Sequence, residues 1–249
     1  MMGRHVRDAW ETVAPPKDNP HGPLPALLVI LTVVTGLVDA FSYLGLGRVF
    51  VANMTGNVVF LSFALGGAEG FVWWASILAI GSFLTGAFAG GRITARHGGH
   101  RGRHLLVAAS AQAGLVVAAL AASLLLPSPY TGWPMALFIL LLGLSMGLQN
   151  ATARALGVPD MTTTALTLTL TGISADSHPA GGKGSHAGRR LVSVASMFTG
   201  GLIGALLCTH GYGDWVLAIT ALLLIVVVAL IAPHRSSDKA WTQKPAPKK

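Results

Sequence analysis

The chain has 249 residues, of which 52% are hydrophobic and only 10% are charged, and its mean hydropathy is +0.62. A typical soluble domain carries roughly 25% charged residues, so a water-soluble globule of this composition would expose large apolar patches. Intrinsic disorder is excluded as well, because it requires low hydrophobicity and a high density of charge. The composition therefore predicts a protein that crosses the membrane several times, provided that its apolar residues form sufficiently long runs.

The net charge of +8 would suit a nucleic-acid partner, but the positions of the charges argue against one. The Lys and Arg residues cluster in short hydrophilic gaps between apolar runs, with almost no aromatic residues among them. This distribution is typical of the cytoplasmic loops of membrane proteins. We therefore expect the lipid bilayer to be the main partner, and we expect no nucleic acid.

In chain order, residues 1–23 come first; they are polar and contain prolines, and we expect a disordered cytoplasmic tail. About six apolar runs follow, each close to the roughly 20 residues that cross a hydrocarbon core of ~30 Å. Within a membrane domain at 24–232, these runs are 24–46, 71–93, 105–126, 135–153, 191–209 and 215–232. Residues 233–249 form a basic tail, which we also expect to be cytoplasmic.

Two further segments, residues 50–65 and 158–173, are apolar but short, and both are polar where they begin. Either both span, which gives eight helices, or both enter the membrane and return on the same side. With eight spans, Arg48, Arg154 and the arginines between positions 92 and 103 would lie outside; with six, only Arg48 would. Because basic residues concentrate in cytoplasmic loops, we predict an all-α fold with about six transmembrane helices, two short re-entrant segments and cytoplasmic termini.

An internal repeat supports this topology, because short strings of the first half recur in the second at an offset of 107 residues. The matched strings are Gly36-Leu37 with Gly143-Leu144, Met54-Thr55 with Met161-Thr162, and Asn53 with Asp160. The pattern Ser-x-x-Thr-Gly-x-x-x-Gly also occurs at Ser82 and again at Ser196. The sequence thus predicts two halves, about 24–126 and 134–232, with three spans each. An odd number of spans makes the repeat inverted, which is a recurring transporter design.

Four strings of the chain resemble a known family. Those of the first half are Gly36-Leu37-Val38-Asp39-Ala40-Phe41-Ser42-Tyr43 and Phe50-Val51-Ala52-Asn53-Met54-Thr55-Gly56-Asn57. Those of the second half are Gly147-Leu148-Gln149-Asn150-Ala151 and Asp160-Met161-Thr162-Thr163. Over roughly residues 24–232 the chain is similar to the YoaK family of bacterial multi-pass membrane proteins, whose function is unknown. The resemblance implies a bacterial membrane protein, which we expect in the plasma (inner) membrane, and it implies no particular substrate.

Asp39 is the most informative single residue, because it lies deep in the first apolar run. A carboxylate at such a depth costs about 2.5–3.5 kcal/mol on membrane-insertion scales. Either it faces a cavity, where it would couple a proton or cation or contact a cationic substrate, or it pairs with Arg48. The second alternative would place Asp39 near the outer interface, about two helical turns from the end of the run.

Polar residues at the starts of the two short segments form a second candidate group for solute binding. They are Asn53, Thr55 and Asn57 in the first segment and Asp160, Thr162, Thr163 and Thr164 in the second. If each segment is a half-helix, its free N–H groups point toward the bilayer centre, where an anion or polar solute binds. The alternative is plain N-capping of two short helices. Gln149 and Asn150, at the end of the fourth run, either line a pathway or bond to neighbouring helices.

The sequence shows no pattern of a metal site, a cofactor site or an enzyme. The loop 97–104 carries three histidines, but it lacks a carboxylate or Cys, and its arginines repel a cation. The chain as a whole also lacks a nucleophile elbow and the motif His-Glu-x-x-His. We therefore expect a protein that is not an enzyme and that holds no metal or cofactor. The sequence therefore predicts a secondary transporter or facilitator of a small polar or ionic solute, as a monomer or a homo-oligomer. The alternative is a membrane scaffold or sensor that does not transport.

Overall fold

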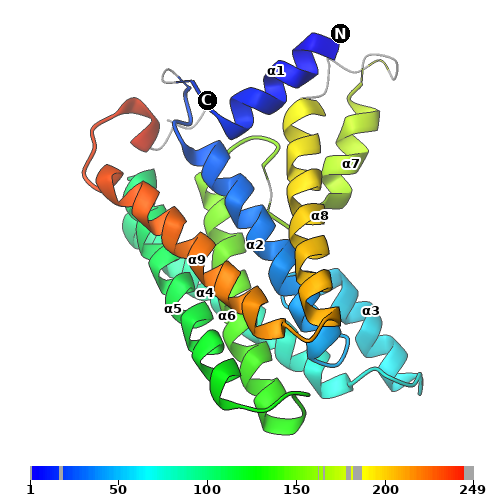
Figure 1. Cartoon of the computed structure of the whole chain (residues 1–249). Helices are drawn as coiled ribbons and strands as arrows, with labels where there is room; N and C mark the ends of the chain where they lie inside the picture. Colours follow the sequence, from blue (N-terminus) through cyan, green and yellow to red (C-terminus); the bar gives the residue numbers. More distant parts are fainter. Residues whose placement is uncertain are drawn as a thin grey trace.

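The computed structural model describes residues 2–16, 19–161, 163–164, 166–177, 181 and 187–243, and over these ranges the protein is built of helices joined by loops (Figure 1). Within them, six helices are long and apolar enough to cross a membrane. These are α2 (Leu24–Gly45), α4 (Trp73–His97), α5 (Arg101–Leu125), α6 (Gly132–Leu156), α8 (Ala187–Thr209) and α9 (Gly213–Ile231). Each coincides with one of the six apolar runs, so the predicted all-α membrane fold is confirmed.

The N-terminal residues differ from the expected disordered tail. They form a helix, α1 (Met2–Val13), that packs against α8 and α2. Val6, Trp10 and Val13 recur at helical spacing, which favours an amphipathic helix, but they are 64%, 69% and 51% exposed, so this apolar stripe faces away from the bundle. The prolines that follow α1 and the polar residues around them give residues 1–23 a composition typical of disordered segments, which is why the sequence predicts a tail there.

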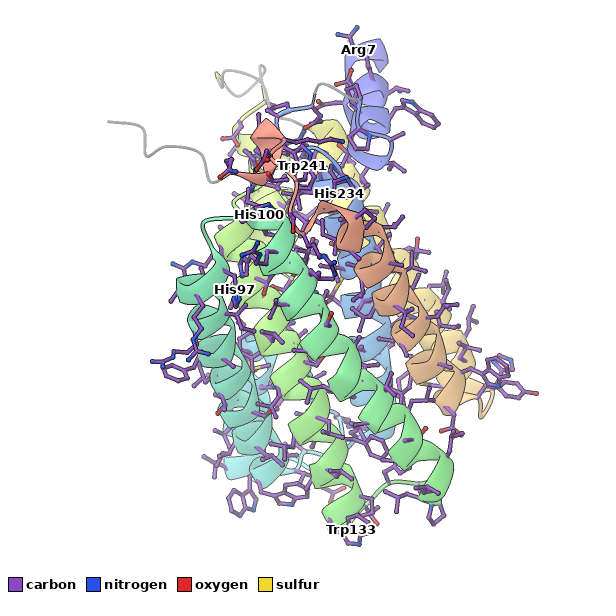
Figure 2. All side chains as sticks on the ribbon, turned by 90° about the vertical axis from the view of Figure 1, so that its left-hand side faces the viewer. Arg7, His97, His100, Trp133, His234 and Trp241 are labelled. Carbon is purple, nitrogen blue, oxygen red and sulfur yellow. The ribbon has the colours of Figure 1, made fainter. Side chains whose placement is uncertain are left out.

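The C-terminal segment is also more structured than a polar tail. It folds into two short 3-10 turns, Ala232–His234 and Ala240–Thr242. The Trp241 ring is buried, and its centroid lies 5.2 Å from that of the His234 ring. Figure 2 shows both rings at the end of the bundle that carries His100, opposite the end that carries Trp133. The segment therefore packs onto the bundle instead of leaving it.

Close crossings between helices that are distant in the sequence hold the bundle together. α2 packs most extensively against α8, and α4 against α6. Both crossings depend on glycine: a Cβ on Gly200 would collide with the Val33 carbonyl, and a Cβ on Gly86 with the Leu144 carbonyl. Small residues allow this close approach in a membrane, where helix association relies on packing. α9 lies on α2 and α5, and α5 also lies on α6, which completes the bundle.

The two short segments are helical but too short to cross a membrane. α3 (Met54–Leu65) has 12 residues and α7 (Leu166–Ala175) has 10, and at a rise of about 1.5 Å per residue both fall well short of a ~30 Å core. Each begins part-way along the bundle and ends at the level where the next long helix starts (Figure 1). α7 starts later than expected, because the chain before it contains Pro159 and then Asp160 in a left-handed conformation, with φ of 59°.

A buried polar network joins three helices in the core. The Gln112 amide on α5 donates to the Gln149 side-chain oxygen on α6 at 2.6 Å. The Gln149 amide donates in turn to Thr35 Oγ1 at 2.8 Å and to the Leu31 carbonyl at 3.1 Å, both on α2. All three side chains are buried. Of its two predicted roles, Gln149 therefore takes the one of bonding to neighbouring helices.

We expect Gln149→Leu to destabilise the protein, because the Gln112 amide would remain buried without its acceptor. A buried polar group without a partner costs about 1–3 kcal/mol. Thermal unfolding of the purified protein in detergent measures the loss. The double variant Gln112→Leu/Gln149→Leu removes the orphaned donor, so it should recover part of the stability. A double variant that loses the sum of the two single effects would contradict the network.

Candidate functional site

The starts of the two short helices meet at one pocket, which has a volume of about 600 Å³. Its walls come from α2, α3, α7 and α8 and from the segments that lead into the short helices. The polar part of the lining is Asp39, Asn53, Thr55, Thr164 and Thr167. The pocket thus brings together four residues that the sequence singled out, which are Asp39, Asn53, Thr55 and Thr164.

Asp39 lies in the second half of α2 and is only 6% exposed. Its Oδ1 accepts a hydrogen bond from the Ala52 N–H at 3.1 Å, so it ties α2 to the segment that leads into α3. The Arg48 guanidinium instead lies 5.8 Å from the centroid of the Phe71 ring. The structure therefore has Asp39 at a cavity and not in the alternative pair with Arg48.

Side chains at the helix starts form the polar wall of the pocket. Asn53 is the N-cap of α3, and its Oδ1 accepts from an N–H of the first turn at 3.4 Å. From the other short helix, Thr164 and Thr167 face the same space. The Asn150 amide on α6 donates to Thr164 Oγ1 at 2.7 Å. Each short helix is thus tethered at its start by the preceding long helix, through Asp39 in one case and Asn150 in the other.

Other residues of the predicted site do not line this pocket. Asn57 is fully buried; it accepts from the Phe50 N–H and donates to the Phe50 carbonyl, so it fixes the turn before α3. Gln149 belongs to the core network described above. Thr162 lies outside the described residues. The role of Asn57 is therefore to hold the backbone that presents Asn53.

Asp160 belongs to an ion-pair network near the end of α7. It accepts from Arg190 on α8, at 2.7 Å from Nη2 and 2.9 Å from Nε. The same guanidinium donates through Nη1 to Asp176 at 2.8 Å and packs on Gly172 of α7. Asp160 is therefore not the counterpart of Asn53 in space, because the chain turns at Asp160 and reaches the pocket only at Thr164.

The electrostatics of the pocket favour a positively charged or polar ligand. Among the lining residues, Asp39 is the one with a formal charge, and the other polar groups are hydroxyls and an amide. The starts of α3 and α7 each carry about half a positive charge, so together they come close to the full charge of one carboxylate, but this charge is spread over several N–H groups. Asn53 also satisfies one of the free N–H groups of α3. The pocket thus suits a proton, a small cation or an uncharged polar group better than an anion.

A second buried centre surrounds Arg101, at the start of α5. Its side chain is 3% exposed and donates to the carbonyl of Leu156, at the end of α6, and to that of Trp241. It also approaches His21 Nδ1 at 3.2 Å. Burial and the neighbouring Arg101 charge lower the pKa of His21, so its ring stays neutral and accepts. No sequence motif signals this centre, because its members come from four separate segments.

Comparisons with known proteins agree with the architecture. Residues 27–230 match the family described as protein of unknown function DUF1275. The chain is 33% identical over 151 residues to the UPF0700 transmembrane protein YoaK of Bacillus subtilis (strain 168), a match that covers 60% of this chain and 65%, just under two thirds, of that relative. No solved structure matches. The chain therefore belongs to the DUF1275 family, a YoaK-like family of membrane proteins of unknown function.

Proposed function

We propose that the protein is a secondary transporter or facilitator of a small polar or ionic solute in the plasma membrane of a bacterium. One observation carries the proposal: the starts of α3 and α7 meet at a polar pocket that contains the buried carboxylate of Asp39. Broken or re-entrant segments that meet near the midplane form the binding sites of many transporters. Irregular backbone is tolerated at membrane depth only where protein buries it or where it lines an aqueous cavity. A scaffold has no need of such a cavity, whereas a sensor would bind its ligand in one, so flux is what distinguishes transport from sensing.

Two inverted halves, α2 to α5 and α6 to α9, would explain why the short helices meet. In support, the glycine contacts of the two halves correspond. The contacts are Gly86 with Leu144 and Gly90 with Ala151 at one crossing, and Gly200 with Val33 and Gly204 with Ala40 at the other. The second-half numbers exceed the first-half numbers by 114 on α4 and α8 and by 111 on α2 and α6.

For the first helix of each half, α2 and α6, we propose this offset of 111 residues in place of the offset of 107. Gly36-Leu37-Val38-Asp39-Ala40 then aligns with Gly147-Leu148-Gln149-Asn150-Ala151. Asp39 then corresponds to Asn150, and each of these side chains makes a hydrogen bond to the segment that leads into a short helix. Asn53 corresponds to Thr164, and each of these residues precedes its short helix. In this proposal a polar side chain of the first helix holds the start of the short helix in both halves. The side chain is a carboxylate at Asp39 and an amide at Asn150, so the pocket has a single charged group.

We also place both termini in the cytoplasm. Six spans bring the two ends of the chain to one side, and the contacts of Arg101 with His21 and the Trp241 carbonyl support this. With this orientation, Arg48 is the one Lys or Arg residue of the sequence outside the cytoplasmic half, as the distribution of positive charge in membrane proteins favours.

Flux through the reconstituted protein tests the proposal. Purified protein is placed in liposomes that hold a pH-sensitive dye, and outward gradients of Na⁺, K⁺ and methylammonium are applied in turn. We expect at least one gradient to change the internal pH faster than it does in protein-free liposomes. If folded, inserted protein changes none of these rates, cation coupling is contradicted. Uptake of uncharged polar solutes by the same liposomes then decides between a facilitator and the scaffold or sensor alternative.

A further inference from the structure

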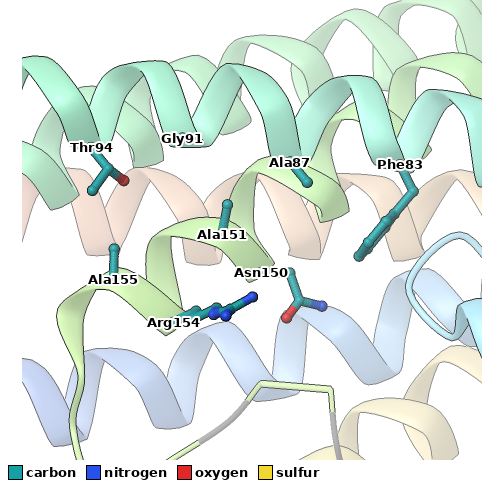
Figure 3. A pocket seen from close by; sticks show the side chains of 8 residues that line it. All are labelled: Phe83, Ala87, Gly91, Thr94, Asn150, Ala151, Arg154 and Ala155. Atoms are coloured by element: carbon teal, nitrogen blue, oxygen red, sulfur yellow. The ribbon is translucent and has the colours of Figure 1, made fainter.

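A second pocket, of about 690 Å³, lies between α4 and α6. Its lining includes Phe83, Ala87 and Gly91 on α4 and Asn150 and Arg154 on α6. Figure 3 shows the guanidinium of Arg154 extended along α6 toward Asn150, with Phe83 and Ala87 facing them from α4. A Cβ on Gly91 would meet no heavy atom within 4 Å, so the space beside this glycine is open. The pocket thus combines an apolar wall with a single cationic group.

Arg154 has no partner for its charge within the described part of the chain. It lies exposed in the last turn of α6, a membrane-spanning helix. The polar groups near it are already engaged, since Thr94 donates to the Gly90 carbonyl and the Asn150 amide donates to Thr164. Because Arg154 is exposed at the end of the span, its charge is open to water or to a headgroup. A guanidinium is the side chain that best matches a phosphate group, so the open pocket beside it calls for an anionic ligand.

We propose that this pocket binds the phosphate group of an anionic phospholipid. Arg154 holds the phosphate, and an acyl chain follows the apolar wall formed by Phe83 and Ala87. The depth fits, because the last turn of a spanning helix lies at the level of the headgroups. The surroundings fit as well, since Leu84 and Phe88 on α4 are 60% and 69% exposed and continue the apolar surface away from the pocket. A free phosphate ion would gain nothing from that surface.

Two variants remove the two halves of the site separately. Arg154→Gln removes the charge, and Gly91→Leu fills the apolar space without touching the charge. Arg103→Gln is the matched control, because Arg103 is exposed at the same end of the bundle but does not line the pocket. The melting temperature of each purified protein in detergent is followed while phosphatidylglycerol, phosphatidylcholine or inorganic phosphate is added.

We expect phosphatidylglycerol to raise the melting temperature of the wild type and of Arg103→Gln, and phosphatidylcholine to raise it much less. Loss of a charge-assisted contact should weaken the apparent affinity about tenfold in Arg154→Gln, and Gly91→Leu should show a similar loss. Equal stabilisation by the two lipids, or an unchanged response in both variants, would overturn the proposal. So would stabilisation by inorganic phosphate alone that Arg154→Gln abolishes, because the site would then serve a soluble anion. If Arg154→Gln does not fold, Gly91→Leu decides between these outcomes.

Discussion

Asp39→Asn is expected to slow strongly the cation-dependent change of internal pH in reconstituted liposomes. The carboxylate is the one formal charge among the residues that line the pocket, so the amide removes the group that attracts a cation or carries a proton. Hydrogen bonds to a charged group contribute about 1.5–3 kcal/mol, which corresponds to a loss of roughly tenfold to hundredfold in rate. The amide oxygen of Asn can still accept from the Ala52 N–H, so we expect insertion and folding to be preserved.

Asp214→Asn is the matched control for this experiment. Asp214 lies in the first turn of α9, outside the pocket, and accepts from the Tyr130 hydroxyl at 3.2 Å. Burial raises the pKa of Tyr130 whether or not position 214 carries a charge, so at neutral pH the hydroxyl remains a donor to the Asn oxygen. The control should retain its flux. Normal flux in Asp39→Asn, with a monodisperse gel-filtration profile, would remove Asp39 from the mechanism.

Gly200→Ala is expected to cause a large loss of stability. The added Cβ would collide with the Val33 carbonyl and would lie 3.1 Å from the Leu37 nitrogen. Both are backbone atoms of α2, so no side-chain rotation can relieve the contact and the two helices must move apart. Overpacking typically costs about 1–3 kcal/mol, and we expect the upper end of this range because α2 is the central helix.

The residue next to it supplies the control. A Cβ on Gly201 would meet one atom, the Gly36 carbonyl oxygen, at 4.0 Å. Gly201→Ala should therefore unfold at the same temperature as the wild type or slightly above it, since alanine favours the helix. Thermal unfolding in one detergent measures both variants. Equal melting temperatures for Gly200→Ala and Gly201→Ala would contradict the close crossing of α2 and α8.

The membrane-spanning part of the fold was predictable, because a bilayer dictates the length and hydrophobicity of each span. All six runs became helices within a few residues of the expected bounds. The helix α1 was not foreseen, since three apolar residues at helical spacing are a weak signal in a polar, proline-containing segment. The Arg101 centre was also missed, because its partners converge only after the bundle has formed.

The pocket was predictable in outline and not in detail. The polar starts of the short segments identified Asn53 and Thr55, and depth in an apolar run identified Asp39. Thr164 belonged to the predicted group, but it could not be ranked above Thr162 and Thr163, and Thr167 was missed, because each threonine is an equally good cap in isolation. Asp160 was predicted as a site residue because of its charge, but in the folded chain it forms an ion pair with Arg190.

The register of the proposed repeat depends on more than residue identity. In so apolar a chain, matches such as Gly-Leu occur by chance at several offsets. The contacts of Gly90 with Ala151 and of Gly204 with Ala40 distinguish 111 from 107, because each added Cβ would lie 2.7 Å from the alanine Cβ. Steric contact between backbones is a stronger constraint than residue identity where most residues are alike.

The crossing of α2 with α8 also has a consequence for how the protein is made. The two helices are separated by residues 46–186, so α2 enters the membrane long before its main partner has been synthesised. The crossing of α4 with α6 joins elements much closer in the sequence and can form first, since closing a shorter loop costs less entropy. During synthesis α2 therefore remains without its closest neighbour until α8 arrives, and the pocket around Asp39 is completed last.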